Sequence, residues 1–128
     1  MAKTVLIVDD DPTQRRLIGA VLEREGFAVV PAVSGQDALD KFASGVSADV
    51  AILDLVMPGM GGLEVLKEMR QRGLSLPVIV LTATGGVETV VQAMQAGAQD
   101  FFVKPASPDR ILVGVRNALA MGGLVTAA

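Results

Sequence analysis

The stretch Val5-Leu6-Ile7-Val8-Asp9-Asp10-Asp11-Pro12-Thr13-Gln14 decides the fold class of this 128-residue chain. Its first four residues are apolar and mostly β-branched, which is typical of a strand buried on both faces of a parallel sheet. Asp11 then supplies an N-cap, Pro12 a favoured first helical residue, and Gln14 a polar side chain at the third helical position. The stretch therefore predicts a strand that passes directly into a helix.

The same alternation recurs along the rest of the chain. Four more short apolar runs are found at Ala28–Ala32, Val50–Leu53, Val78–Leu81 and Phe101–Val103. A segment with helical periodicity follows each of the five apolar runs. These segments extend from Asp11 to Gly26, from Ser34 to about Phe42, over Gly62–Gln71, over Val87–Ala96, and from Ser107 to Leu119. Short strands that alternate with helices of about ten residues predict right-handed crossovers. We expect an α/β fold of the (βα)5 type, with a doubly wound parallel five-stranded sheet.

The composition limits the chemistry that the chain can perform. Cys, His, Trp and Tyr are absent from the sequence. The lack of Cys excludes disulfides and thiolate metal sites, and the lack of His removes the commonest general base and metal ligand. Any chemistry must therefore use carboxylates, lysine, hydroxyl groups and the backbone.

Charge and hydropathy limit the partners. The chain has 11 basic and 14 acidic residues without a basic block, so we expect no direct binding of nucleic acid. Its apolar runs fall far short of the roughly 20 residues that span a bilayer, so we expect no membrane segment. The N-terminus leads straight into the first strand without a signal peptide, which favours a cytoplasmic location.

Polar side chains stand at the carboxyl ends of four of the predicted strands. They are Asp9 and Asp10 after the first, Asp54 after the third, Thr82 after the fourth and Lys104 after the fifth. Each alone is an ordinary cap, turn residue or surface charge, but ligands of doubly wound sheets bind at this edge. Three carboxylates in one place require a cation, and oxygen ligands without His or Cys favour Mg²⁺. The lysine and the hydroxyl would then complete a surround for a phosphoryl group.

At these residues the chain resembles the receiver domains of response regulators, the signalling switches of two-component systems. The matching motifs are Val5–Pro12, Ile52–Gly59, Leu76–Ala83 and Phe101–Pro105, and the resemblance covers about Thr4 to Leu119. It implies a flavodoxin-like strand order 2-1-3-4-5. We expect a receiver domain over residues 1–120, followed over residues 121–128 by a tail or the start of a linker.

The resemblance also implies roles for the residues at the strand ends. Asp54 would be the phosphoacceptor, with Lys104 paired to the phosphate. Mg²⁺ would be bound by Asp10 and Asp54 directly, by Asp9 through water, and by the backbone carbonyl of Val56.

Further roles concern the conformational switch. Thr82 would supply the switch hydroxyl, and Phe101 would be the switch aromatic, although Phe102 competes for that description. The bond between Lys104 and Pro105 would be cis.

Two features depart from the family pattern, one at Gly61 and one at the pair Val56 and Thr84. Many relatives have Asp where this chain has Gly61, so the following helix loses a cap and its loop should be looser. Val56 and Thr84 occupy the positions that tune the phosphoryl lifetime, and neither side chain is acidic or amidic. We therefore expect a phosphoryl-aspartate that is not unusually short-lived.

The predicted function is a phosphoacceptor switch rather than an enzyme, although it would assist its own phosphorylation and dephosphorylation. Because the chain has no His, the donor would be a separate sensor histidine kinase. The face formed by residues 87–96, 101–103 and 107–119 would change and control an output. Val87, Val90 and Val91 would lie in a homodimer or output interface, or else in ordinary core packing.

The output cannot be read from the chain itself. Residues 86–102 resemble receivers of sigma-54-dependent activators of the nitrogen-regulator type, which favours control of transcription through a domain absent from this sequence. The alternative is a stand-alone receiver that relays phosphate or regulates a partner protein.

Three other functions fit the sequence less well. A haloacid-dehalogenase-like phosphatase needs a second Asp two residues after the nucleophile, where this chain has Val56. A nucleotide or flavin binder needs a glycine-rich phosphate loop, of which residues 59–62 are only a weak mimic. A degenerate receiver that acts only as a scaffold would lack key positions, all of which are present.

Overall fold

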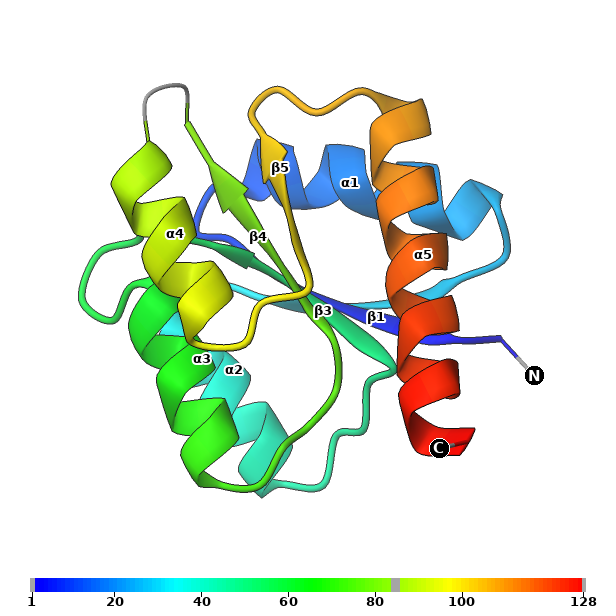
Figure 1. Ribbon diagram of the computed structural model, residues 1–128. Coiled ribbons are helices and arrows are strands. Elements are labelled where there is room, and N and C mark those ends of the chain that lie inside the picture. Colours follow the sequence, from blue (N-terminus) through cyan, green and yellow to red (C-terminus); the bar gives the residue numbers. More distant parts are fainter. Residues whose placement is uncertain (1, 84–85, 128) are drawn as a thin grey trace.

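The computed structural model describes the backbone of residues 2–83 and 86–127, and the side chains of these residues up to Ala120. Thr84, one of the two lifetime positions, lies outside the described residues. Within them, five strands alternate with five helices (Figure 1). In chain order these are β1 (Thr4–Val8), α1 (Pro12–Arg24), β2 (Ala28–Ala32), α2 (Gly35–Ala43), β3 (Val50–Asp54), α3 (Gly62–Gln71), β4 (Val78–Thr82), α4 (Val87–Gln95), β5 (Asp100–Val103) and α5 (Pro108–Ala127).

The strands form one parallel sheet in the order β2-β1-β3-β4-β5, which confirms the predicted fold class and strand order. The register aligns the carboxyl ends of the central strands, because Val8 lies opposite Leu53 and Leu53 lies opposite Val80. The residues that follow, Asp9 and Asp54, are therefore neighbours at one edge of the sheet.

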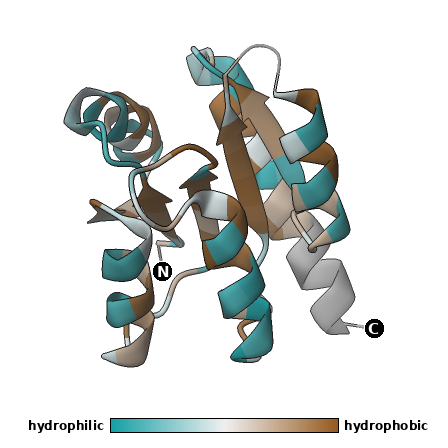
Figure 2. Cartoon of the chain, turned by 90° about the vertical axis from the view of Figure 1, so that its left-hand side faces the viewer, coloured by the Kyte–Doolittle hydropathy of each residue, from teal (hydrophilic) through white to brown (hydrophobic). Residues whose placement is uncertain are grey.

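Helices cover both faces of the sheet. One face packs on α1 and α5, and its core includes Ile7, Ile52 and Phe102. The other packs on α2, α3 and α4, and its core includes Leu53, Leu66 and Val80. Figure 2 shows the strands as a hydrophobic layer between helices whose outward surfaces are largely hydrophilic. The apolar character of β1, β3 and β4 at nearly every position follows from this double coverage.

Local signals begin and end the helices as the sequence predicts. The backbone N–H of Thr13 donates to Asp11 Oδ1 over 2.9 Å at the start of α1, and that of Asp37 donates to Ser34 Oγ over 3.0 Å at the start of α2. Gly73 follows α3 with a φ of 79°, a left-handed conformation that glycine adopts without strain.

The last helix differs from the prediction. The periodicity predicts an end at Leu119, whereas α5 continues to Ala127. That residues 121–128 form a tail or the start of a linker stays a prediction. The two glycines at 122 and 123 each cost about 1 kcal/mol in a helix interior, but a helix that is already nucleated can propagate through them. None of the helices within residues 2–83 and 86–127 has the length and hydrophobicity of a membrane-spanning segment.

Candidate functional site

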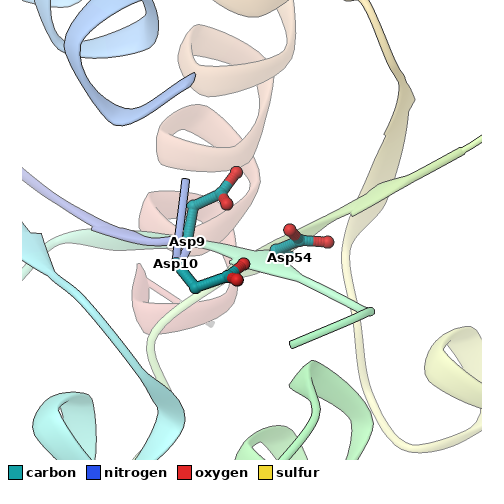
Figure 3. Close-up of side chains that lie close together, drawn as sticks. All are labelled: Asp9, Asp10 and Asp54. Carbon is teal, nitrogen blue, oxygen red and sulfur yellow. The ribbon is translucent and has the colours of Figure 1, made fainter. Parts of the chain in front are cut away.

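The structure brings the polar residues of the strand ends together at one edge of the sheet. Asp9 and Asp10 follow β1, while Asp54 is the last residue of β3. Figure 3 shows these three side chains gathered where β1 and β3 end. Backbone bonds beyond the strands hold the neighbouring segments in register, since Lys104 N donates to the carbonyl of Thr82 over 2.8 Å.

The three aspartates form a compact carboxylate cluster. One carboxylate oxygen from each of Asp9, Asp10 and Asp54 lies within 4.8 Å of the others. Asp9 and Asp54 are buried, whereas Asp10 is exposed. The cluster is therefore anchored in the protein on one side and open to solvent on the other.

Asp9 is the most constrained member of the cluster. Its Oδ1 accepts a hydrogen bond from the N–H of Asp11 over 3.0 Å, while its Oδ2 is buried and accepts none from the described residues. Burial raises the pKa of Asp9 to about 6, and the nearby charge of Asp54 adds to the increase. The N–H of Asp11 and the charge of Lys104 act in the opposite direction.

Lys104 joins the cluster from the end of β5. Its Nζ donates to Asp54 Oδ2 over 2.8 Å and lies 3.6 Å from Asp9 Oδ2. Burial alone would lower the pKa of Lys104, but the hydrogen bond to Asp54 and the charges of both aspartates outweigh burial and raise it. Asp54 Oδ1 accepts a second hydrogen bond, from the N–H of Val56 over 3.0 Å. The carboxylate of Asp54 is thus held at both oxygens.

These residues fit a hard divalent cation. The donors are carboxylate oxygens only, and Asp9 Oδ2 is a buried acceptor that no described group hydrogen-bonds. Lys104 pairs with Asp9 and Asp54, and Asp10 adds a third carboxylate, so the cluster retains an excess of negative charge that a divalent ion would balance. Val56 has a side chain that is 75% exposed, so any part it takes in binding belongs to its backbone.

The candidate switch residues lie on the β4–β5 side of the site. Thr82 is buried, and its hydroxyl donates to the carbonyl of Ala83 over 3.1 Å. Phe101 is 38% exposed, whereas Phe102 is fully buried in the core beneath α5, with the guanidinium of Arg110 4.9 Å from its ring centroid. Phe102 is therefore a core residue, whereas Phe101 is partly exposed to solvent. The bond between Lys104 and Pro105 is cis.

The sequence did not indicate two residues near the site. Arg15 in α1 donates from Nη1 to the backbone carbonyl of Asp9 over 2.6 Å, which ties the helix to the aspartate-bearing turn. Gly62 lies so close to the backbone of Asp54 that a Cβ there would overlap the carbonyl of Asp54. The sequence places Arg15 in the first turn of α1, but it does not distinguish this arginine from one whose charge faces solvent.

Comparisons with known proteins agree with this geometry. The model of the response regulator receiver domain family matches residues 5–116. The chemotaxis protein CheY of Bacillus subtilis is 39% identical over 120 residues, which are 93% of this chain and 99% of CheY. The regulatory protein AtoC of Escherichia coli is 39% identical over 117 residues, which are 91% of this chain and 25% of AtoC.

A solved structure gives the same result. The crystal structure of NtrX from Brucella abortus superimposes with a TM-score of 0.93 at 31% identity, covering 99% of this chain and 29% of NtrX. This chain thus spans only about a quarter of the length of AtoC and NtrX, but nearly all of CheY.

Members of the matching family share a defined biochemical character. Receiver domains are signalling switches rather than classical enzymes, bind Mg²⁺ at an acidic pocket and interact with sensor histidine kinases. The fold, the aspartate cluster and the match over residues 5–116 all agree with that character. This chain belongs to the response regulator receiver domain family of two-component systems.

Proposed function

We propose that Asp54 accepts a phosphoryl group from a phosphohistidine of a sensor kinase. The observation that carries the proposal is the position of Asp54, which is held by Lys104 over 2.8 Å beside two further carboxylates. A carboxylate oxygen of Asp54 forms the new bond to phosphorus while the bond from phosphorus to the histidine nitrogen breaks. The leaving imidazole keeps that electron pair and takes a proton from solvent.

Negative charge dominates the energetics of this transfer. Asp9, Asp10 and Asp54 would hold Mg²⁺, with the carbonyl of Val56 as a further ligand. The bound ion would neutralise charge on the phosphoryl oxygens. Lys104 supplies a second positive charge from the other side, and its pKa, raised by Asp54 and Asp9, keeps it protonated. With both positive charges already in place, the carboxylate of Asp54 can bind the phosphoryl group without a movement of β3.

The phosphoryl group then changes the hydrogen-bonding partners of Thr82. In the structure the hydroxyl of Thr82 donates to Ala83, whereas a phosphoryl oxygen on Asp54 offers a stronger, charged acceptor. Movement of Thr82 toward Asp54 opens space on the α4 side of the sheet, where Phe101 is partly exposed. Phe101 turns inward into that space, so the face made by α4, β5 and α5 changes. The switch is a population shift that the phosphate biases.

Labelling with a small phosphodonor tests the assignment. Acetyl phosphate with Mg²⁺ should phosphorylate the wild-type protein and leave Asp54→Asn unmodified, as measured by intact-protein mass spectrometry. Asp40→Asn is the matched control, because Asp40 is an exposed aspartate on α2 and should not affect labelling. Equal labelling of wild type and Asp54→Asn would show that Asp54 is not the phosphoacceptor.

The lifetime of the phosphoryl group follows from what surrounds it. The Val56 side chain next to Asp54 is apolar and exposed, and it offers no group to position a hydrolytic water. We expect a phosphoryl-aspartate that lasts well beyond a few seconds. Val56→Glu should shorten the lifetime, as followed by loss of the label after the donor is removed.

The output of the switch is the second level of the proposal. AtoC and ResD are named as regulatory proteins, and this chain spans 25% and 47% of their lengths, which supports control of transcription through a further domain. The match to 99% of CheY supports the alternative, a single-domain switch that acts on a partner protein in the cytoplasm. The length of the reading frame that encodes the chain distinguishes a transcription regulator from a single-domain switch. Only the transcription regulator requires an output region after Ala128.

A further inference from the structure

Gly86 lies against the hydroxyl of Thr82. It is the N-cap residue of α4, and a Cβ built on its backbone would overlap Thr82 Oγ1. The same Cβ would lie 3.3 Å from the carbonyl oxygen of Ala83. The space that a side chain at position 86 would need is thus already taken by the Thr82 hydroxyl.

This hydroxyl occupies a defined seat, formed by the carbonyl of Ala83 and the bare Cα of Gly86. The carbonyl of Ala83 accepts from Thr82 Oγ1 over 3.1 Å and from the N–H of Gly86 over 3.2 Å. Both carboxylate oxygens of Asp54 have other donors, in Val56 and Lys104. The seat therefore holds Thr82 in an arrangement that does not include Asp54.

Neither backbone conformation nor capping requires glycine at position 86. Its φ of −84° and ψ of 36° lie outside the left-handed region, so the backbone accepts other residues. Its N-cap position has no side-chain hydrogen bond, and Ser, Asn or Asp would cap α4 better. The remaining local reason for glycine is the space that the hydroxyl of Thr82 uses.

We infer that Gly86 is a positioning residue for the switch: by lacking a side chain, it allows Thr82 to keep its hydroxyl in the resting seat. This inference rests on the proposed function, in which Thr82 leaves that seat for a phosphoryl oxygen. A side chain at position 86 displaces Oγ1, because rotation about one side-chain bond of Thr82 relieves the overlap without moving the backbone. The resting state is then destabilised, and the phosphate-binding state gains population.

The expected consequence is tighter binding of a phosphoryl analogue. When the binding-competent state is only fractionally populated, the apparent affinity falls by that fraction. If a side chain at position 86 excludes the Thr82 hydroxyl from its resting seat, the apparent affinity for the analogue should rise again. We expect Gly86→Ala and Gly86→Ser to bind beryllofluoride with Mg²⁺ about fivefold more tightly than the wild type, at the low end of typical coupling effects.

The direct test measures the side-chain rotamer of Thr82 by NMR in the protein free of metal and phosphate. Three-bond couplings to the Thr82 methyl carbon should change in both Gly86→Ala and Gly86→Ser. Serine retains a capping oxygen for α4, so an effect shared by both variants does not arise from a frayed helix end. Gly61→Ala is the matched control: Gly61 is likewise the N-cap of a helix without a side-chain cap bond, but its Cβ would meet the carbonyl of Leu55.

The outcomes separate the inference from the proposed function. Unchanged Thr82 couplings in both Gly86 variants overturn the inference, as does a changed rotamer with weaker beryllofluoride binding. Failure of the wild-type protein to bind beryllofluoride or to accept phosphate overturns the proposed function instead, while the couplings of the free protein still decide whether Gly86 positions Thr82.

Discussion

At the scale of single residues, we expect the buried carboxylate of Asp9 to lower the stability of the protein when no metal is bound. Its buried Oδ2 has no hydrogen-bond donor among the described residues and lies beside the carboxylate of Asp54. Asp9→Asn removes the charge, and the new amide can donate to a neighbouring carboxylate. In EDTA, where no metal ion can balance the charge of Asp9, we expect the variant to be more stable than the wild type. Its free energy of unfolding should be about 1–3 kcal/mol higher. Urea unfolding followed by circular dichroism measures the difference.

The same variant should lose its response to Mg²⁺. The wild-type protein gains stability with added Mg²⁺ through linkage, whereas Asp9→Asn should gain little. Asp40→Asn, which alters an exposed aspartate, should behave as the wild type in both conditions. Lower stability of Asp9→Asn in EDTA would show that the carboxylate is engaged favourably without metal, contrary to the prediction.

Some residues of the site could be predicted from the sequence, and others could not. Asp9, Asp54 and Lys104 directly follow or end apolar strands, and parallel strands bring those ends together whatever the details of packing. Phe101 was preferred to Phe102 as the switch aromatic through the family resemblance alone, because both residues fit a strand and burial, which distinguishes them, cannot be read from the pattern. Gly86 was missed as well, because its contact with Thr82 depends on how the chain turns between them.

At the scale of elements, α3 begins next to the site without a side-chain cap. Its N-cap is Gly61, which makes no side-chain hydrogen bond, as the departure from the family pattern at this position led us to expect. With a φ of −77° and a ψ of 169° the backbone accepts any residue. A Cβ at this position would lie 3.0 Å from the carbonyl of Leu55, so substitution also adds crowding.

Comparing Gly61→Ser with Gly61→Ala separates the cap from the crowding. Both variants carry the same Cβ, but only serine can accept a hydrogen bond from the first turn of α3. We expect the serine variant to be more stable than the alanine variant by about 1 kcal/mol, measured by urea unfolding. Serine is preferred to aspartate because a further carboxylate would add charge near the aspartate cluster. Equal stabilities would mean that crowding prevents the capping geometry.

The start of α2 makes a pH-dependent contribution to stability. Asp37 accepts a hydrogen bond from the N–H of Val33 over 3.0 Å and pairs with Lys41 over 2.9 Å. The hydrogen bond with Lys41, followed by that with Val33, lowers the pKa of Asp37. A pKa that is lower in the folded state stabilises the protein above the unfolded value of about 3.9, and this stabilisation is lost as the pH falls through the folded value.

Asp37→Asn should therefore lower the free energy of unfolding at pH 7 by about 0.5–1 kcal/mol, because the asparagine cannot pair with Lys41. The difference between variant and wild type should shrink as the pH falls from the unfolded pKa of Asp37 through its lower folded pKa, because Asp37 then becomes protonated in the folded protein as well. Unfolding curves at pH 7, 5 and 3 provide the measurement. A difference that is constant over this range would rule out the charge of Asp37 as its cause.

Elements were predictable where a boundary signal is strong. Asp11 with Pro12 and Ser34 are the caps that the sequence indicated, and their hydrogen bonds are present. The predicted end of α5 at Leu119 was too early, because the apolar periodicity stops there while the helix runs on to Ala127. A glycine lowers helix propensity, but only a left-handed residue or a proline ends a helix reliably.

At the scale of the whole molecule, the fold followed from alternation alone. Strands that are apolar on both sides need helices on both faces, and right-handed crossovers leave few arrangements of five parallel strands. The sequence left open whether Val87, Val90 and Val91 are exposed or packed in the core, because helical periodicity does not show how wide a buried stripe is. In the structure Val87 and Val91 are exposed, whereas Val90 packs against the core. The structure places several exposed apolar residues on α4, β5 and α5, namely Val87, Val91, Met94, Phe101, Val103 and Val113.

These residues lie on β5, an edge strand of the sheet, and on α4 and α5, which flank it (Figure 1). They belong to the face that the proposed switch alters. An edge strand flanked by exposed apolar side chains favours association with another chain. We expect beryllofluoride with Mg²⁺ to shift the protein from monomer toward homodimer, as measured by sedimentation velocity over a range of concentrations. Val91→Lys, on α4, should prevent the shift, because it would place charge in the interface. Val33→Lys is the matched control, since Val33 is also exposed but follows β2, the edge strand on the opposite side of the sheet. A monomer in every state, or equal loss of the dimer in both variants, would contradict a dimer through α4, β5 and α5 and leave this surface for a different protein.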